Sequence, residues 1–197
     1  MSRTVPIMDT KTALSAQYEA ATSIVPSRES AEPWLWADAP DTPLAEDDHP
    51  WSGKWLWFTP LSLLDRSWAT IRAATEDGLL GYRSKAGTLI NTRRMSDDTR
   101  RPICVYTRDW HDIPDVQRVL TNLRALGIVD VLLYKTDSDI RRGHYGAGAS
   151  TYIAPATKTT VVIPKGTREA LDHHHAARAQ ARKTAAARRK APALKHN

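Results

Sequence analysis

The sequence predicts an α+β fold in which helices cover one face of a β-sheet. Predicted elements follow the order strand, helix, strand, strand, helix, strand, and then two further strands. Of the 197 residues, 41% are hydrophobic and 25% are charged, which is sufficient for one buried core with polar tails. The sequence has no run of about 18 apolar residues, so it offers no candidate transmembrane helix and we expect no membrane partner.

Charge divides the chain into three parts. The net charge is −6 over residues 1–53, +5 over 54–164 and +7 over 165–197. We expect the domain organisation to follow this division: an acidic, largely irregular arm, a single core domain and a basic tail, over residues 1–49, 50–164 and 165–197. The arm contains Trp34 and Trp36, and we expect this piece to dock on the core because large aromatic side chains favour burial.

Local signals predict the first strand and helix of the core. Residues 54–58 are aromatic and apolar and lie between Gly53 and Pro60, a pattern typical of a strand. We expect Thr59 to be the N-cap of a helix, with Pro60 at its first position, and Gly78 to end that helix. Apolar or small side chains then recur at helical spacing: Leu61, Leu64, Trp68, Ile71 and Thr75.

The remaining core elements are predicted in the same way. A second helix begins at Asp112, with Asp115 three residues later as a carboxylate variant of the capping box, and ends at Gly127. Residues 91–101 are polar and 137–150 are rich in glycine, so both are expected to be loops. Apolar runs predict the other strands over 79–85, 103–107 and 129–135, and a closing hairpin over 151–154 and 159–163.

The sequence also limits the location and the cofactor chemistry. The N-terminus lacks the apolar stretch of a signal peptide, so we expect a soluble, cytoplasmic protein. Cys104 is the only cysteine, which excludes an intrachain disulfide, and its place in a strand favours a buried, inert thiol. The triplet His173–His175 lies in the tail without fixed geometry, so we expect neither a metal site nor a cofactor.

Several stretches taken together resemble one protein family. They are SGKWLWF (52–58), LLGYRSKAGT (79–88), ICVYTRDWHDIPDVQRVLTNLRALG (103–127) and LLYKTDSDIRRGHY (132–145). Over about residues 50–155 the chain resembles the basophilic leukemia-expressed protein family. This resemblance implies the fold of the cap-binding translation initiation factors, a curved antiparallel sheet backed by helices on one face. Bacterial and phage members are often labelled phosphothreonine lyase domain proteins, although Ile140 here replaces a threonine of the family pattern.

Cationic side chains on the predicted strands suggest an anion site. Lys54, Lys85 and Lys135 lie on or at the ends of strands, and Arg83 shares a face with Lys85. Residues on one face of a curved sheet converge, and a cluster of cations favours an anion such as a phosphate dianion. We expect Lys54, Arg83 and Tyr145 to bind the phosphate of a peptide or nucleotide. The alternative is that these are separate surface cations.

The resemblance implies β-elimination on phosphothreonine, which needs a base and an acid. The base must be a lysine kept neutral by desolvation or by neighbouring cations, and Lys85 and Lys135 are the candidates. The acid protonates the leaving oxygen. The candidates are His144 and His111, with Tyr145 as a third. We favour His144, in the glycine-rich loop, over His111, which precedes a helix cap and is expected at the surface.

Tryptophans suggest a non-catalytic alternative, binding of a nucleotide or RNA. Cap-binding factors hold a base between two tryptophans. Trp51, Trp55, Trp57 and the arm residues Trp34 and Trp36 could supply such a cage, together with the same cations. Trp55 and Trp57 share one face of the first core strand and are the main candidates. The competing interpretation is that Trp34 and Trp36 cover them and that all four are packing residues.

The basic tail carries a separate prediction. Residues 166–191 are rich in Ala, Arg and Lys, and Leu171 is almost their only large apolar side chain. Such a segment can be helical but has nothing to bury. We expect it either to contact nucleic acid without sequence preference or to act as a solubilising tail.

Overall fold

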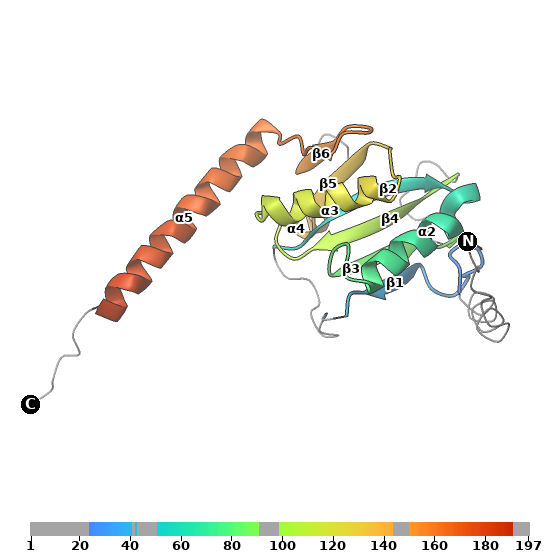
Figure 1. The fold of residues 1–197 in the computed structure, drawn as a ribbon, viewed down its shortest axis with the longest axis horizontal. Coiled ribbons are helices and arrows are strands. Elements are labelled where there is room, and N and C mark those ends of the chain that lie inside the picture. Colours follow the sequence, from blue (N-terminus) through green and yellow to red (C-terminus); the bar gives the residue numbers. More distant parts are fainter. Residues whose placement is uncertain (1–23, 41, 43–50, 91–98, 144–149, 191–197) are drawn as a thin grey trace, which may run out of the picture.

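The computed structural model describes residues 24–40, 42, 51–90, 99–143 and 150–190. A six-stranded antiparallel sheet has the strand order β1-β3-β4-β2-β5-β6. Its strands are β1 (Trp34–Asp38), β2 (Gly53–Pro60), β3 (Arg83–Gly87), β4 (Arg100–Thr107), β5 (Leu132–Thr136) and β6 (Tyr152–Ala154). Helices α2 (Leu61–Glu76) and α3 (Ile113–Ala125) cover one face (Figure 1). The predicted α+β fold, a curved antiparallel sheet backed by helices, is confirmed.

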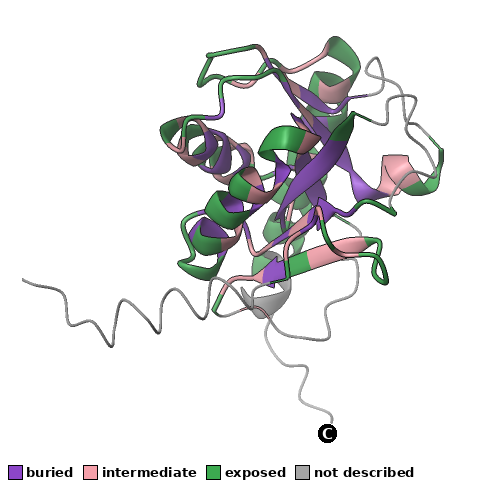
Figure 2. Ribbon diagram, turned by 90° about the vertical axis from the view of Figure 1, so that its right-hand side faces the viewer, coloured by how far each residue is buried: buried purple, intermediate pink, exposed green. Residues whose placement is uncertain are grey.

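The strand register separates a core face from an open face. One row of directly opposed residues crosses all six strands and points toward the helices: Ala37, Ser84, Val105, Trp55, Tyr134 and Tyr152. All six are buried. Figure 2 shows the same concentration of buried residues on the strands and on the helix sides that face them. Because side chains alternate along a strand, the flanking rows point to the opposite face.

Helix α2 packs through the side chains that its periodicity predicts. Leu64, Trp68 and Ile71 are buried against the sheet. The predicted cap is wrong by one residue: Pro60 occupies the N-cap position, and Thr59 belongs to β2 with its hydroxyl 3.3 Å from that of Ser67. Gly78 follows the helix with φ of 72°, a left-handed conformation that favours glycine and ends the helix as expected.

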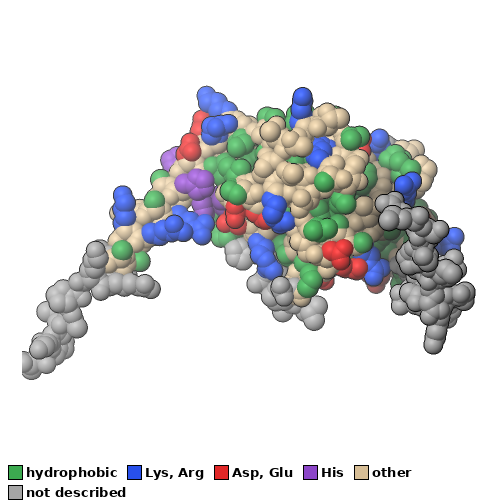
Figure 3. Space-filling view, viewed as in Figure 1, with side chains coloured by type: hydrophobic (Ala, Val, Ile, Leu, Met, Phe, Trp, Pro, Cys, Tyr) green, Lys and Arg blue, Asp and Glu red, His purple; other side chains and the backbone are tan. Residues whose placement is uncertain are grey.

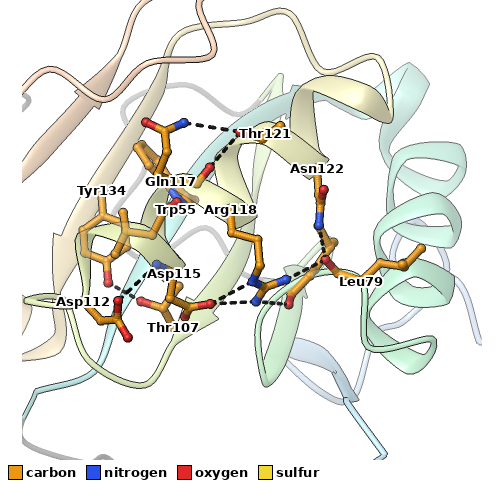
Figure 4. Close-up of polar contacts among 12 residues, drawn as sticks. Trp55, Leu79, Thr107, Asp112, Asp115, Gln117, Arg118, Thr121, Asn122 and Tyr134 are labelled. Carbon is orange, nitrogen blue, oxygen red and sulfur yellow. Dashed lines mark hydrogen bonds and ion pairs between the residues drawn. The ribbon is translucent and has the colours of Figure 1, made fainter.

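Helix α3 begins at its predicted cap and fixes the loop that precedes β3. The Asp112 carboxylate accepts a hydrogen bond from the backbone N–H of Asp115 at 3.2 Å. Arg118 pairs with Asp115 at 2.8 Å and donates to the Leu79 carbonyl at 3.0 Å (Figure 4). Asn122, also on α3, donates to the same carbonyl, so two side chains of the helix hold the entry to β3.

Two segments form elements that the sequence did not predict. Residues 34–38 were assigned to the N-terminal arm, but they form β1 and pair with β3 at the sheet edge, so the sheet extends beyond the expected boundary at residue 50. Residues 137–141 were expected in a loop but form helix α4 (Asp137–Arg141). Thr136 caps α4, because its hydroxyl accepts the backbone N–H of Asp139 at 3.0 Å.

The C-terminal segment forms helix α5 (Lys165–Lys190), which extends away from the sheet (Figure 1). Leu171 is only 3% exposed and belongs to the hydrophobic core, so the expectation that this segment buries nothing is wrong. Among the described residues, no helix combines the length and the apolar character that crossing a membrane requires. Because Leu171 is buried in the core, helix α5 is anchored at its first turns, and the described part beyond them is polar and mostly exposed.

Candidate functional site

The open face of the sheet carries a second row of directly opposed residues, and this row is polar. It lies one position along from the buried row and crosses five strands: Asp38, Arg83, Tyr106, Lys54 and Lys135. Directly opposed side chains point to the same face and lie close together. Hydrogen-bonded pairing of distant segments therefore places three of the predicted cations beside one another, away from the helices.

A cavity of about 790 Å³ lies over this row. Its described lining consists of four cations, two carboxylates, three aromatic rings and one aliphatic side chain: Lys54, Arg83, Lys85, Arg141, Asp38, Asp137, Trp36, Tyr82, Tyr106 and Ile140. The charged members give the lining a formal net charge of +2. Of the four cations expected to converge, Lys54, Arg83 and Lys85 line this one cavity, and Lys135 is not among its described lining residues.

Lys54 is held at the base of the cavity by a buried ion pair. Its ammonium contacts the carboxylate of Asp137, at the start of α4, and lies 3.3 Å from the hydroxyl of Tyr106. The other Asp137 oxygen accepts a hydrogen bond from the Ser52 hydroxyl at 2.5 Å. With these partners Lys54 is fixed in direction, so it presents a positioned charge to the cavity.

Arg83 is held in a comparable way at the side of the cavity formed by β1. Its Nε donates to the Asp38 carboxylate at 2.5 Å, and its guanidinium carbon lies 5.4 Å from the Trp36 ring. Burial opposes the charged form, but the hydrogen bond and the charge of Asp38 raise the pKa of Arg83 above its usual value. The arginine is therefore charged and oriented at any accessible pH.

Lys85 lies among aromatic rings. Its Nζ is 4.2 Å from the ring centre of Trp34, 4.6 Å from that of Trp36 and 5.4 Å from that of Tyr106. Ring faces attract a cation through their negative quadrupole, so this environment favours the charged ammonium. Trp34 and Trp36 therefore lie on the open face, where they contact Lys85 and, in the case of Trp36, Arg83. They do not cover Trp55 and Trp57, which face the helices.

Lys135 lies opposite Lys54 in the register but is not among the described residues that line the cavity. Its side chain is buried. Burial lowers the pKa of Lys135 below its usual value and outweighs the charge of Asp139, which raises it. Lys135 thus has the desolvated environment that a neutral lysine requires. It lies beside the cavity residue Lys54 and not in the described lining itself.

The stacking prediction is wrong for Trp55 and Trp57. Trp55 is 1% exposed, lies in the buried row and donates its indole N–H to the Val116 carbonyl at 3.1 Å. Trp57 also faces the helices, where it packs against the core and donates to Asp130 at 2.7 Å. Neither ring shares a face with the cations, because an odd sequence separation from Lys54 turns both to the other side.

The other candidate residues divide into two groups. His144 and Tyr145 lie outside the described residues. His111 was expected at the surface, but it is 6% exposed, because the rings of Trp110 and His174 lie against it. It is not among the described residues that line the cavity, and it lies between β4 and α3.

Sequence reasoning missed several residues of the cavity. Asp137 and Arg141 belong to the quoted stretch 132–145, but the glycines nearby favoured a loop over helix α4. Tyr106 lies two residues after Cys104 on β4 and therefore shares its face. Because Cys104 pairs with Lys85, Tyr106 also shares the face of Lys85, but this follows only from the strand register. No local signal marks Asp38, because its contact with Arg83 depends on the addition of β1 to the sheet.

The family comparison agrees with the resemblance seen in the motifs. The family model described as basophilic leukemia-expressed protein Bles03 matches residues 10–141. The matched range begins within the N-terminal arm and includes β1, the described cavity residues and α4, whereas β6 and α5 lie beyond it. The match covers well over half of the chain, and so the chain belongs to the basophilic leukemia-expressed protein Bles03 family.

Proposed function

We propose that the cavity on the open face binds a phosphorylated ligand. The observation that carries this proposal is the meeting of four cationic side chains, from β2, β3 and α4, in one cavity that contains two carboxylates. Arg83 and Lys54 are already oriented by their carboxylate partners, so they offer positioned donors without the loss of freedom that binding would otherwise require. Arg141, in the last turn of α4, and Lys85 supply further donors.

The chemistry of these donors suits a phosphate monoester. Guanidinium and ammonium groups form short charge-assisted hydrogen bonds with phosphate oxygens, and a dianion offers several acceptors to donors on different sides. A carboxylate ligand of single charge would gain less from a lining with net charge +2. The expected ligand class is therefore a phosphate ester, such as a phosphothreonine peptide.

A nucleotide is the second candidate ligand, and the exposure of Trp36 favours it. Trp36 is 48% exposed although it lines the cavity, and its ring centre lies 6.2 Å from that of Tyr106. An exposed indole beside cations can stack on a base whose phosphate the cations hold. In this candidate, the stacking residue is Trp36, one of the arm tryptophans that the sequence offered, and not Trp55 or Trp57.

Binding is better supported than β-elimination. Elimination needs a neutral lysine in contact with the substrate, and Lys135, whose pKa burial lowers, is not among the described lining residues. Lys85 lies among aromatic rings, which favour its charged form. We therefore propose phosphate binding as the function. Elimination is tested separately, by the mass of the phosphopeptide after incubation with the protein.

The test compares a phosphothreonine peptide, its unphosphorylated counterpart and AMP by isothermal titration calorimetry. We expect the phosphopeptide to bind and the unphosphorylated peptide not to bind. Lys85→Met and Arg141→Gln should each weaken binding by about tenfold, equivalent to about 1.4 kcal/mol. Lys158→Gln removes an exposed cation outside the cavity and is the matched control. Equal binding of both peptides, or equal losses in the control, would overturn the proposal.

Two further readouts separate the candidates. Mass spectrometry of the incubated phosphopeptide shows whether it loses phosphoric acid, and an unchanged mass excludes the lyase activity. Stronger binding of AMP than of the phosphopeptide, with loss of the AMP preference in Trp36→Leu, would assign the site to nucleotides.

The tail supports a separate proposal, contact with nucleic acid. Residues 173–190 of α5 contain six Lys or Arg and no Asp or Glu, and cationic side chains follow α5 in Figure 3. Such contact should weaken steeply with salt, because bound phosphates release counterions. Deletion of residues 177–197 should abolish it, and retained binding would place the contact on the core.

A further inference from the structure

Helix α5 meets the core where three titratable side chains come together outside the cavity. Leu171 is buried in the core, and one turn later His174 lies against His111, in the segment between β4 and α3. Figure 3 shows histidine side chains next to acidic ones where α5 joins the rest of the molecule. The third member, Asp109, lies two residues before His111.

His111 is oriented by its neighbours. Its Nδ1 lies 2.7 Å from a carboxylate oxygen of Asp109, and the same oxygen accepts the His111 backbone N–H at 2.9 Å. The imidazole is stacked between two rings, with centre distances of 3.7 Å to Trp110 and 3.5 Å to His174. The Asp109 carboxylate and the His111 imidazole are therefore held side by side, with donor atoms of both within reach of one ion.

His174 contributes a ring nitrogen, Nε2, that is buried without a hydrogen-bond partner among the described residues. A buried polar atom without a partner destabilises the folded state. Coordination of a cation would satisfy this nitrogen. By sequence alone the histidine triplet has no fixed geometry, but the contact with His111 fixes the position of His174.

The three side chains form a donor set with close spacing. One ligand atom from each of Asp109, His111 and His174 lies within 4.8 Å of the others. Two imidazoles and one carboxylate are a donor set that Zn²⁺ and similar ions accept.

We propose that Asp109, His111 and His174 bind a divalent transition-metal ion of the Zn²⁺ type, which holds α5 against the core. The two imidazole planes are within 13° of parallel, so binding turns the His174 ring on α5 until its nitrogen and that of His111 point to one ion. Ligand atoms around Zn²⁺ lie about 3.3 Å apart, so the set contracts on binding. Arg178, whose Nη1 is 3.9 Å from the other Asp109 oxygen, stays on the outer side of that carboxylate.

The test measures Zn²⁺ affinity in the full-length, chelator-treated protein by competition with a chromophoric chelator. We expect one high-affinity site per chain, and we expect His174→Ala and His111→Ala each to weaken it by at least about tenfold. Asp109→Asn should weaken it as well. A circular dichroism melt checks that His174→Ala and His111→Ala both keep the fold.

The adjacent histidines provide matched controls. His173→Ala and His175→Ala remove an imidazole from the same triplet, and we expect both to retain the affinity of the natural chain. If either weakens Zn²⁺ binding as much as His174→Ala, the triplet binds an adventitious ion only. That result overturns the proposal, as does the absence of Zn²⁺ binding to the natural chain or full retention of affinity in His111→Ala.

Discussion

The buried pair between Lys54 and Asp137 gives a quantitative test of the cavity. Their side chains are only 8% and 7% exposed, and Lys135 lies opposite Lys54 on the neighbouring strand. Asp137→Asn leaves the Lys54 ammonium buried without its counter-charge, and removal of one member of a buried pair destabilises by about 3–5 kcal/mol. We expect a loss near 3 kcal/mol, because the Tyr106 hydroxyl remains at 3.3 Å and the cavity admits water.

Urea denaturation followed by tryptophan fluorescence measures this loss. With a slope of about 2 kcal/mol per molar urea, the midpoint should fall by about 1.5 M. The same substitution raises the formal net charge of the cavity lining from +2 by one unit, so inorganic phosphate should bind more tightly to the folded variant. Lower stability together with higher phosphate affinity is the signature of a counter-charge within an anion site.

Two controls make the outcome decisive. Lys54→Met with Asp137→Leu removes both charges and should recover most of the stability, since a hydrophobic pair of similar volume replaces a buried ion pair well. Glu76→Gln breaks the exposed pair with Arg72 on α2 and should change stability by less than about 0.5 kcal/mol. A midpoint shift below about 0.5 M in Asp137→Asn, or no recovery in the double variant, would refute the reasoning.

Three further predictions concern tryptophan, the tail and the cysteine. Trp36→Ala should leave the melting temperature nearly unchanged, whereas Trp55→Ala should destabilise by about 3–5 kcal/mol because the Trp55 ring fills the core. A thermal melt in which Trp36→Ala is the more damaging change would contradict the assigned faces. Leu171→Ala should destabilise by about 2 kcal/mol in urea denaturation, whereas deletion of residues 177–197 should have little effect, and equal effects would show that α5 is not anchored at its first turns. Cys104 is 1% exposed and burial raises the pKa of its thiol, so a thiol reagent at pH 8 should modify it only after unfolding; rapid native labelling would disprove this packing.

Most of the fold was predictable because its signals are local. The capping carboxylate of Asp112, the apolar faces of both helices and the glycines after them determine where α2 and α3 lie in the chain. The strand at 34–38 was not predictable in this way, since β1 is stabilised by pairing with β3 and by tryptophan contacts with Lys85. Helix α4 is short and depends on the cap at Thr136, which the glycine-rich context obscured.

The sequence by itself determined the class of the fold, the order of its core elements and the residue types of the candidate site, because helix periodicity, strand alternation and charge are properties of neighbours in the chain. Only the tertiary structure decided which cations share the cavity, which carboxylates hold them and which tryptophans face them. Those relations depend on strand order and register, and a shift of one residue in register turns every side chain of a strand to the opposite face. Hydrogen bonds and packing among segments distant in sequence select that register, as the pairing of Asp38, Arg83, Tyr106, Lys54 and Lys135 across five strands shows.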